Sequence, residues 1–297
     1  MSRFAFVAAE RGNHAVAMLC RIVGASVSGF YAWLRAIPAT QARAEAEAEL
    51  RGYIGHVFAA GRRVYGAPRV HAELRRRGRR HSRRRIARLM REMGLQAQRG
   101  RRRPPRTTNS QHDLPVAPNL LDRHFVAERP DTVRLADISY LPTDEGWLYL
   151  AVVEDLATRE IVGWSMADHL RAELCVDALV MALQHRRPGP GLVHHSDRGG
   201  QYAAEPYRKV LRRYGIKQSM SRKGDCLDNA PMESFFASLK KEQVHHARFR
   251  SRAQARAAVF EYVEVFYNRQ RLHSALGYRT PIEARAGMKA IIRPKAA

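Results

Sequence analysis

Three acidic residues stand out in a chain that is otherwise strongly basic. Asp137 lies in the middle of VRLADISYLPT, whose alternation of apolar and polar residues predicts a strand. Asp197 directly follows the apolar run LVHHS, and Glu233 lies one turn into a predicted helix, with 35 residues between the two acids. Carboxylates that converge from separate elements would bind divalent cations, and oxygen ligands favour Mg²⁺ or Mn²⁺ over zinc. Two such ions about 3.5–4 Å apart could activate a nucleophile and stabilise a leaving oxygen in phosphoryl transfer.

The composition indicates a polyanionic partner. Lys and Arg number 52 against 28 Asp and Glu, which gives a net charge of +24 and an isoelectric point near 11.0. This balance favours nucleic acid or an anionic membrane surface. No apolar run approaches the ~20 residues of a membrane-spanning helix, so we expect a soluble protein with no membrane partner. Gly199 and Gly200, just after Asp197, would let a nucleic-acid backbone approach closely.

The cysteines give no sign of a disulfide framework or a zinc site. Cys20, Cys175 and Cys226 are odd in number, widely spaced and without a CxxC pair. This pattern fits a protein of the reducing cytoplasm.

A run of basic helices is predicted before the acidic residues. Between Gly61 and Arg106 there are 18 arginines, no lysine and two acids. Apolar residues at helical spacing in AEAELRGYIGHVF, GAPRVHAELRRRG and HSRRRIARLMREMGL predict three short helices, the last capped by Ser82. They favour a helix-turn-helix unit at residues 45–98 with DNA contacts through Arg69, Arg83, Arg84, Arg85 and Arg88. The alternative is a solvated basic hairpin with no specific role on DNA.

The rest of the chain divides where the composition changes. Residues 1–44 have a helical pattern around VSGFYAWLR, and residues 99–127 include a basic, proline-rich stretch typical of a linker. From Val133 the predicted order is three strands, helix, strand, helix, strand, helix. That order indicates an α/β core at residues 128–247, with a mixed sheet flanked by helices. Residues 248–297 are expected to form a final helix and a short tail.

Four segments, taken in order, resemble one known family. LADISYL, HHSDRGGQY, DNAPMESFFASLKKE and YNRQRLHSALGYRTP are similar to the catalytic core of DDE transposases of the retroviral-integrase type. The chain resembles the product of the second reading frame (OrfB type) of bacterial insertion sequences named after insertion sequence three. YGAPRVHAELRRRG and RRRIARLMREMGL resemble the helix-turn-helix that precedes that core. The similarity runs from about Val27 to Arg285.

The resemblance implies a ribonuclease-H-like fold and specific site residues. It implies a catalytic and metal-binding triad of Asp137, Asp197 and Glu233 that holds two ions of Mg²⁺ or Mn²⁺. It also implies a basic residue seven positions after the glutamate, where Lys240 shares a helix face with Glu233. Further expected DNA contacts are Asn229, Lys240, Arg269, Arg271 and His273. For the C-terminal motif that contains the last three residues, a structural plug at a helix end is the alternative.

The implied activity is the cleavage and joining of DNA strands at the ends of an insertion sequence. The implied partners are the terminal inverted repeats, target DNA, further copies of the chain, and an upstream reading-frame product that is fused to it or paired with it. The implied location is the bacterial cytoplasm, at the nucleoid. Two alternatives remain open: a plain metal-dependent nuclease on the same fold, and a non-catalytic or decayed DNA-binding protein. The second is kept open by Arg134 and Ala136, where the family usually has tryptophan and threonine.

Several other residues have both a functional and a structural interpretation. Asp155 could support the metal site or end a strand. Two histidine pairs could be metal ligands, but an oxygen-rich setting favours packing or phosphate contact for His194, His195, His245 and His246. Two tryptophans, Trp147 and Trp164, are expected in the core.

Overall fold

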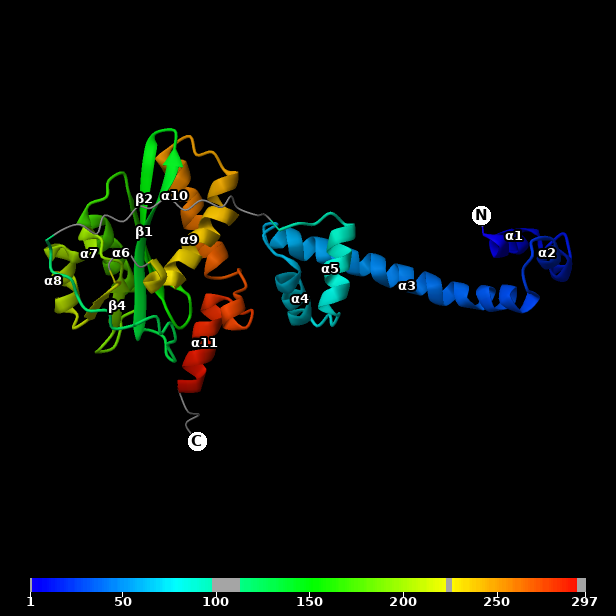
Figure 1. The fold of residues 1–297 in the computed structure, drawn as a ribbon, viewed down its shortest axis with the longest axis horizontal. Coiled ribbons are helices and arrows are strands. Elements are labelled where there is room, and N and C mark those ends of the chain that lie inside the picture. The colour runs from blue at the N-terminus through cyan, green and yellow to red at the C-terminus, as the bar shows by residue number, and fades with distance from the viewer. Residues whose placement is uncertain (1, 98–112, 223–225, 293–297) are drawn as a thin grey trace.

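The computed structural model describes the whole chain except residues 1, 98–112, 223–225 and 293–297 (Figure 1). Residues 99–112 of the predicted basic linker therefore lie outside the described residues. The part of it that is described, from residue 113 onward, contains neither helix nor strand.

The N-terminal part is entirely helical. Helix α1 (Arg3–Glu10), α2 (Val16–Ile22) and α3 (Val27–Ala60) come first, followed by α4 (Ala67–Arg76) and α5 (Arg83–Glu92). Helix α3 is one continuous element of 34 residues that runs through the boundary proposed between residues 44 and 45. Among the described residues no single helix is long and apolar enough to cross a membrane; only the bent pair α2 and α3 meets that test together, by length and composition.

The predicted helix-turn-helix unit is formed by the C-terminal end of α3 with α4 and α5. The apolar faces of the three helices pack into one cluster through Leu50, Ile54, Val57, Phe58, Val70, Leu74, Ile86, Leu89 and Met90. Helix α5 begins at the predicted cap, since Ser82 Oγ accepts a hydrogen bond from the Arg85 amide at 3.2 Å. Gly78 ends the turn after α4 with φ +79°, a conformation that glycine adopts without steric cost.

The second part is a five-stranded mixed sheet with helices on both faces. Strands β1 (Val133–Thr143), β2 (Gly146–Asp155), β3 (Ile161–Ala167), β4 (Val193–Ser196) and β5 (Lys217–Met220) lie in the order β3-β2-β1-β4-β5. The first three form an antiparallel meander, and β4 and β5 join β1 in parallel. The predicted mixed sheet is confirmed.

The two faces of the sheet bury alternate residues. On one face Ala151 and Val153 of β2 pack against α6 (Ala172–His185), α7 (Gly200–Ala203) and α8 (Glu205–Arg213). On the other face Leu150 and Val152 pack against α9 (Ala230–Glu242), α10 (Arg252–Phe260) and the π-helix Glu261–Tyr267. Figure 1 shows these two groups of helices on either side of the strands. Because both faces are covered, β2 is apolar along most of its length.

The C-terminal region has more structure than the sequence analysis predicted. The expected short tail contains helix α11 (Pro281–Ile292). Its start is a capping box, in which Glu283 accepts from the Thr280 amide at 2.9 Å and Thr280 Oγ1 accepts from the Glu283 amide at 3.2 Å. The sequence TPIE carried this signal, and the prediction of a tail overlooked it.

The prediction that both tryptophans lie in the core is wrong for Trp147. Its side chain is 49% exposed on the β1–β2 hairpin and packs edge-on against Tyr140, with 4.7 Å between ring centroids. Trp164 is half-buried, and its indole Nε1 donates a hydrogen bond to Glu264 at 2.8 Å. A strand residue near a hairpin end can have one side of its ring against a neighbour and the other in solvent, which alternation alone does not reveal.

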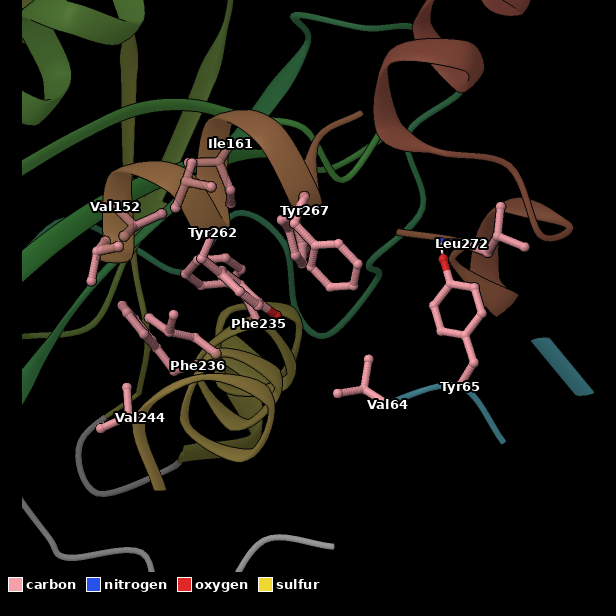
Figure 2. Close-up of a cluster of buried hydrophobic side chains, with 14 of the residues drawn as sticks. Val64, Tyr65, Val152, Ile161, Phe235, Phe236, Val244, Tyr262, Tyr267 and Leu272 are labelled. Carbon is pink, nitrogen blue, oxygen red and sulfur yellow. Dashed lines mark hydrogen bonds between the residues drawn. The ribbon is translucent and has the colours of Figure 1, made fainter. Parts of the chain in front are cut away.

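The helix-turn-helix unit docks on the C-terminal segment of the sheet domain. Tyr65 Oη donates to the Gln270 carbonyl at 3.0 Å and accepts from the Leu272 amide at 2.9 Å, and Figure 2 shows the Tyr65 ring directed toward Leu272. Arg69 Nε donates to the Leu272 carbonyl at 2.9 Å, and Arg76 pairs with Glu283. These contacts join segments about 200 residues apart in sequence, so the two parts share one apolar cluster.

We expect the Tyr65 hydroxyl to be a measurable part of this junction. Tyr65→Phe keeps the ring but leaves the buried Leu272 amide without its acceptor, which should lower the free energy of unfolding by about 1–3 kcal/mol. Tyr214→Phe is the matched control, because Tyr214 is 45% exposed. Denaturant unfolding of both variants measures the difference. Equal stability of the two variants would contradict this account of the junction.

Candidate active site

Strand pairing brings the first two acids of the predicted triad together. The parallel register of β1 and β4 pairs Leu135 with His195 and Ala136 with Ser196. Asp137 follows Ala136 on β1, and Asp197 follows Ser196 at the end of β4. Neighbouring strands lie about 4.7–4.9 Å apart, so two residues one step beyond a register pair stay close together. Both carboxylates are half-buried at the point where β4 ends and β1 continues.

Two hydrogen bonds hold the start of α9 against the same point. Asn229, directly before the helix, donates from Nδ2 to the Ala136 carbonyl at 3.2 Å. His195 Nε2 lies 2.9 Å from the Asp228 carbonyl oxygen, and its Nδ1 lies 2.8 Å from Ser219 Oγ. The helix therefore begins next to the strand position that precedes Asp137, and Glu233 follows one turn later on an exposed face.

Asp228 is a positioning residue that the sequence analysis missed. Its buried carboxylate accepts from the Arg222 amide at 2.9 Å and from Arg222 Nη2 at 2.8 Å, and it pairs with Arg123 Nε at 3.0 Å. The Arg222 hydrogen bond, above all, holds the pKa of Asp228 well below its usual range. This network fixes the short 3₁₀ turn Cys226–Asn229 from which α9 starts. In the sequence, Asp228 is distinguished only by its position two residues before Ala230, the first residue of α9.

The three carboxylates influence one another electrostatically. Burial raises the pKa of Asp137 well above its usual value, and the negative charges of Asp197 and Glu233 raise it further, while Lys240 acts in the opposite direction. Like charges at such a site disfavour ionisation unless a cation compensates them. Within the described parts of the chain, no three His, Cys, Asp or Glu side chains are close enough to enclose one ion. The donors are all carboxylates, which fits a hard divalent cation held on an open site.

Lys240 faces the acids from the second turn of α9 after Glu233. Its ammonium lies 5.2 Å from the centre of the Tyr140 ring, three residues along β1 from Asp137. Burial lowers the pKa of Lys240, and the charge of Asp137 raises it. Lys241, by contrast, is exposed on a different face of the helix. The predicted pairing of Glu233 and Lys240 on one face agrees with this arrangement.

Gly199 has a structural role in addition to any contact with DNA. Its amide donates to Asp197 Oδ1 at 2.9 Å, and a Cβ at this position would lie 3.0 Å from the same oxygen. Glycine thus allows the Asp197 carboxylate to fold back onto its own loop. The Arg198 Nε also donates to the Ser221 carbonyl at 2.6 Å, which ties this loop to the end of β5.

The departures at Arg134 and Ala136 are accommodated within the fold. Arg134 is fully buried, and its guanidinium donates to the Arg186 carbonyl at 2.5 Å and to Asp131 at 2.8 Å. The Arg134 side chain therefore packs on the face of the sheet that α6 covers and does not face the acids. Ala136 is buried in the apolar face next to α6, and its carbonyl accepts the Asn229 hydrogen bond.

Asp155 ends a strand, which was one of the two interpretations left open. Its Oδ1 accepts from the Thr158 amide at 2.9 Å, and its Oδ2 accepts from the Asp131 amide at 2.7 Å and lies 3.6 Å from Arg285. The carboxylate stabilises the turn between β2 and β3. Its register partner on β1 is Arg134, three residues before Asp137.

One of the two histidine pairs is buried and packed, and the other is exposed. His194 is buried with Nε2 2.5 Å from Tyr207 Oη, and burial lowers its pKa to about 3. Burial also lowers the pKa of His195, so both rings are neutral at pH 7. His245 and His246 are exposed in the 3₁₀ turn after α9. The preference for packing over metal ligation holds for the buried pair.

The five arginines expected to contact DNA differ in their surroundings. Arg83 and Arg84 are exposed at the start of α5. Arg88 forms ion pairs with Glu47 at 2.9 Å and Glu92 at 2.7 Å, and Arg85 lies 3.8 Å from Glu47. Arg69 is half-buried in the junction with the sheet domain. Of these five arginines, Arg83 and Arg84 therefore offer the most exposed charge to DNA.

Arg271 and His273, two of the expected DNA contacts, are buried in this fold. Arg271 is 4% exposed and binds Glu242 with two nitrogens at 2.7 and 2.6 Å, and His273 is 7% exposed and packs edge-on against Tyr267. The motif YNRQRLHSALGY thus closes the end of α9, which is the structural alternative. Arg269 remains exposed. Asn229 is also buried, and its amide faces Ala136.

Comparison with known proteins agrees with this arrangement. Models described as an integrase core domain match residues 127–226 and 214–281, and an HTH-like domain matches residues 44–103. The insertion element IS600 uncharacterized 31 kDa protein of Shigella sonnei is 45% identical over 263 residues, covering 89% of this chain and 96% of that protein. Transposase InsF for insertion sequence IS3A of Escherichia coli (strain K12) is 40% identical over 279 residues, covering 94% and 96%.

Solved structures similar to this chain include two viral proteins. The simian T-cell lymphotropic virus intasome in complex with PP2A regulatory subunit B56 gamma matches with a TM-score of 0.46 at 13% identity, over 64% of this chain and 63% of that one. The HTLV-2 integrase catalytic core domain in complex with magnesium (trimeric form) matches with a TM-score of 0.40 at 13% identity, over 53% and 97%. The sequence relatives decide the family, and on their evidence the chain belongs to the insertion-sequence transposases that carry an integrase-type DDE core.

Proposed function

We propose that this transposase cuts a phosphodiester at each end of its insertion sequence and joins the freed 3′-hydroxyl to a second phosphodiester. Asp137, Asp197 and Glu233 are the proposed metal ligands. The observation that carries the proposal is the β1–β4 register, which sets Asp137 beside Asp197, together with the Asn229 hydrogen bond that starts α9 next to them.

The proposed cofactor is a pair of Mg²⁺ or Mn²⁺ ions. Bound there, divalent metal would lower the pKa of the attacking water or hydroxyl and stabilise the leaving oxygen. The protein supplies the fixed parts of this chemistry. The pairing of β1 with β4 places two carboxylates on rigid strands, and α9 presents Glu233 from the side. Burial, and after it the nearby charges of Asp197 and Glu233, raise the pKa of Asp137, which is the cost of placing these acids together.

Lys240 is proposed to hold a phosphate of the DNA strand beside the acids. Its ammonium is restrained by burial and by the Tyr140 ring and so points along the same helix face as Glu233. An ammonium attracts a phosphate as a point charge, without the paired geometry of a guanidinium. Restraint of the side chain reduces the entropy lost when the phosphate binds.

The proposed DNA partners are the terminal inverted repeats and the target, with Arg83 and Arg84 as the principal phosphate contacts of α5. A complex of several copies would hold both ends together. The chain would act either fused to, or paired with, the product of an upstream reading frame. A plain nuclease on this fold would cut without joining. A decayed, non-catalytic protein would show disrupted positions around the acids, whereas Arg134 and Ala136 are both well packed.

Loss of one acid should abolish both cutting and joining. Asp197→Asn removes one proposed ligand and should slow strand joining by on the order of a thousandfold or more, since metal assistance contributes several kcal/mol to the barrier. Labelled element ends with Mg²⁺ provide the assay, and Asp177→Asn on the exposed face of α6 is the matched control. Near-normal joining by the Asp197 variant would overturn the triad assignment.

The same acids should couple metal binding to stability. Because the folded protein raises the pKa of Asp137, metal-free protein should lose stability as pH rises above the usual carboxyl range. Asp137→Asn lacks that loss, so thermal unfolding in chelator should show a flatter pH dependence. Added Mg²⁺ should raise the melting temperature of the wild type more than that of the variant.

Lys240 and Lys241 should behave differently although they are neighbours. Lys240→Ala should impair joining of a pre-cut end by roughly tenfold or more while leaving the Mg²⁺-dependent rise in melting temperature unchanged. Lys240→Arg should retain much of the activity because the charge is kept. Lys241→Ala, on the exposed face, should join like wild type. The reverse pattern for the two alanine variants would place the phosphate on another face of α9.

Arg83 and Arg84 should account for part of the salt dependence of DNA binding. Each lost phosphate contact reduces the slope of log K against log salt by ~0.9, so the double alanine variant should lower it by up to about 1.8. Arg88→Ala should change the slope less, because Glu47 and Glu92 already neutralise that guanidinium. Titrations of a duplex at several salt concentrations measure the slopes. An unchanged slope in the double variant would move the binding surface elsewhere.

A further inference from the structure

Residues 3–35 form a small folded unit of their own. Helices α1, α2 and the first turns of α3 pack around a buried cluster that is separate from the two larger ones and consists of Val7, Leu19, Cys20 and Phe30. Figure 1 shows α1 and α2 at the opposite end of α3 from the sheet domain. The proposed DNA-binding surfaces of α5 and of the active site do not include this unit.

The geometry of α2 and α3 is that of a helix-turn-helix. Only four residues separate Ile22 from Val27, and the chain bends by 106° between the two helices. The turn contains Gly24 at φ +63°, and Ser26 Oγ caps α3 by accepting from the Gly29 amide at 3.1 Å. A helix pair at 90–120° joined by a short turn with glycine is the arrangement that DNA-binding helix-turn-helix units use.

Helix α1 braces this pair as a third helix. Arg3 Nη1 donates to the Gly24 carbonyl in the turn at 3.2 Å. Gly29 permits close contact between α1 and α3, since a Cβ there would lie 3.2 Å from the Phe4 ring. The Phe4 ring also packs against Trp33 of α3, with 5.9 Å between ring centroids. The three helices therefore hold the start of α3 in a fixed orientation.

The exposed face at the start of α3 has residues suited to a DNA groove. It extends from one flank of the buried Phe30 to the opposite side of the helix and is formed by Val27, Ser28, Tyr31, Ala32 and Arg35, which are all exposed. These side chains offer hydroxyl groups, an apolar surface for a thymine methyl group and one guanidinium. The unit carries four arginines and one glutamate up to Arg35, so its charge is complementary to DNA.

Helix α3 holds this unit at a distance from the other helix-turn-helix unit. Every residue from Pro38 to Ala46 is exposed, so the middle of the helix is a solvated spacer. At ~1.5 Å per residue, 34 residues extend about 51 Å. This exceeds one turn of B-form DNA, about 34–36 Å. The two units can therefore contact separate segments of one duplex.

We infer that residues 3–35 are a second helix-turn-helix unit that binds duplex DNA through this face of α3. The chain would then recognise two segments of DNA, one with the unit at each end of α3. The inference rests on the proposed function only in taking DNA as the ligand. It concerns binding alone, so it can be tested in metal-free conditions in which no strand is cut.

The test is selection of binding sites by the full-length chain in chelator. The probe is a pool of duplexes with about 40 randomised base pairs, which at ~3.4 Å each exceed the length of α3. The test variant is Ser28→Ala with Tyr31→Ala and Arg35→Ala. The matched control is Arg43→Ala, which removes an exposed arginine from the spacer of the same helix. Ser28→Glu is a second variant, because an acid in the first turn stabilises a helix yet repels phosphate.

We expect the wild type and Arg43→Ala to select two sequence blocks separated by a gap. The triple variant and Ser28→Glu should select one block only and bind the two-block duplex about tenfold or more weakly. Selection of both blocks by the triple variant, or of a single block by the wild type, would overturn the inference. If the triple variant keeps both blocks and changes the mass measured by light scattering, the face joins copies of the chain and the inference is also wrong. Failure of strand joining by the wild type would leave these binding outcomes unaffected.

Discussion

The parallel pairing of β1 with β4 is the contact on which the proposed active site depends. Four register pairs bring two segments about 60 residues apart in sequence into one sheet, and they end just before Asp137 and Asp197. A shift of one residue would turn either side chain to the opposite face. The register is favoured by packing, since both faces of the sheet are covered and a shifted strand would place side chains of the wrong size and polarity against each layer of helices. Backbone hydrogen bonds between strands therefore bring the two acids together despite their repulsion.

Buried ion pairs fix the elements that surround this pairing. Asp228 holds the start of α9, while Glu242 near its end is bound by Arg271. Removing one partner of such a pair leaves an uncompensated buried charge, which costs about 3–5 kcal/mol. The position of Glu233 along the sheet is thus determined from both ends of its helix. Arg222 lies six residues before Asp228, whereas Arg123 and Arg271 come from segments 105 and 29 residues away from their partners.

The many arginines serve two roles, contact with phosphate at the surface and ion pairing inside the protein. The net charge does not show which arginine has which role. Some arginines are exposed on α5, where they are available to phosphate. Others are inside the protein: Arg134 donates to backbone carbonyls below the sheet, and Arg285 pairs with Asp131 and lies near Asp155. Two further arginines, Arg69 and Arg76, form the hydrogen bond and the ion pair that join the helix-turn-helix unit to the sheet domain. The guanidinium suits these sites because its planar donors can satisfy several oxygens at once.

The sequence by itself determined the order of strands and helices, the mixed sheet, the cap at Ser82 and the candidate acids, because periodicity, turn residues and spacing are local properties. It also carried the capping box of α11, which was overlooked. Only the tertiary structure decided which basic residues face solvent. Arg271 and His273 lie in the same motif as the exposed Arg269, yet they are buried against Glu242 and Tyr267. Burial of a side chain depends on partners that are distant in the chain, and no local pattern encodes which partner will arrive.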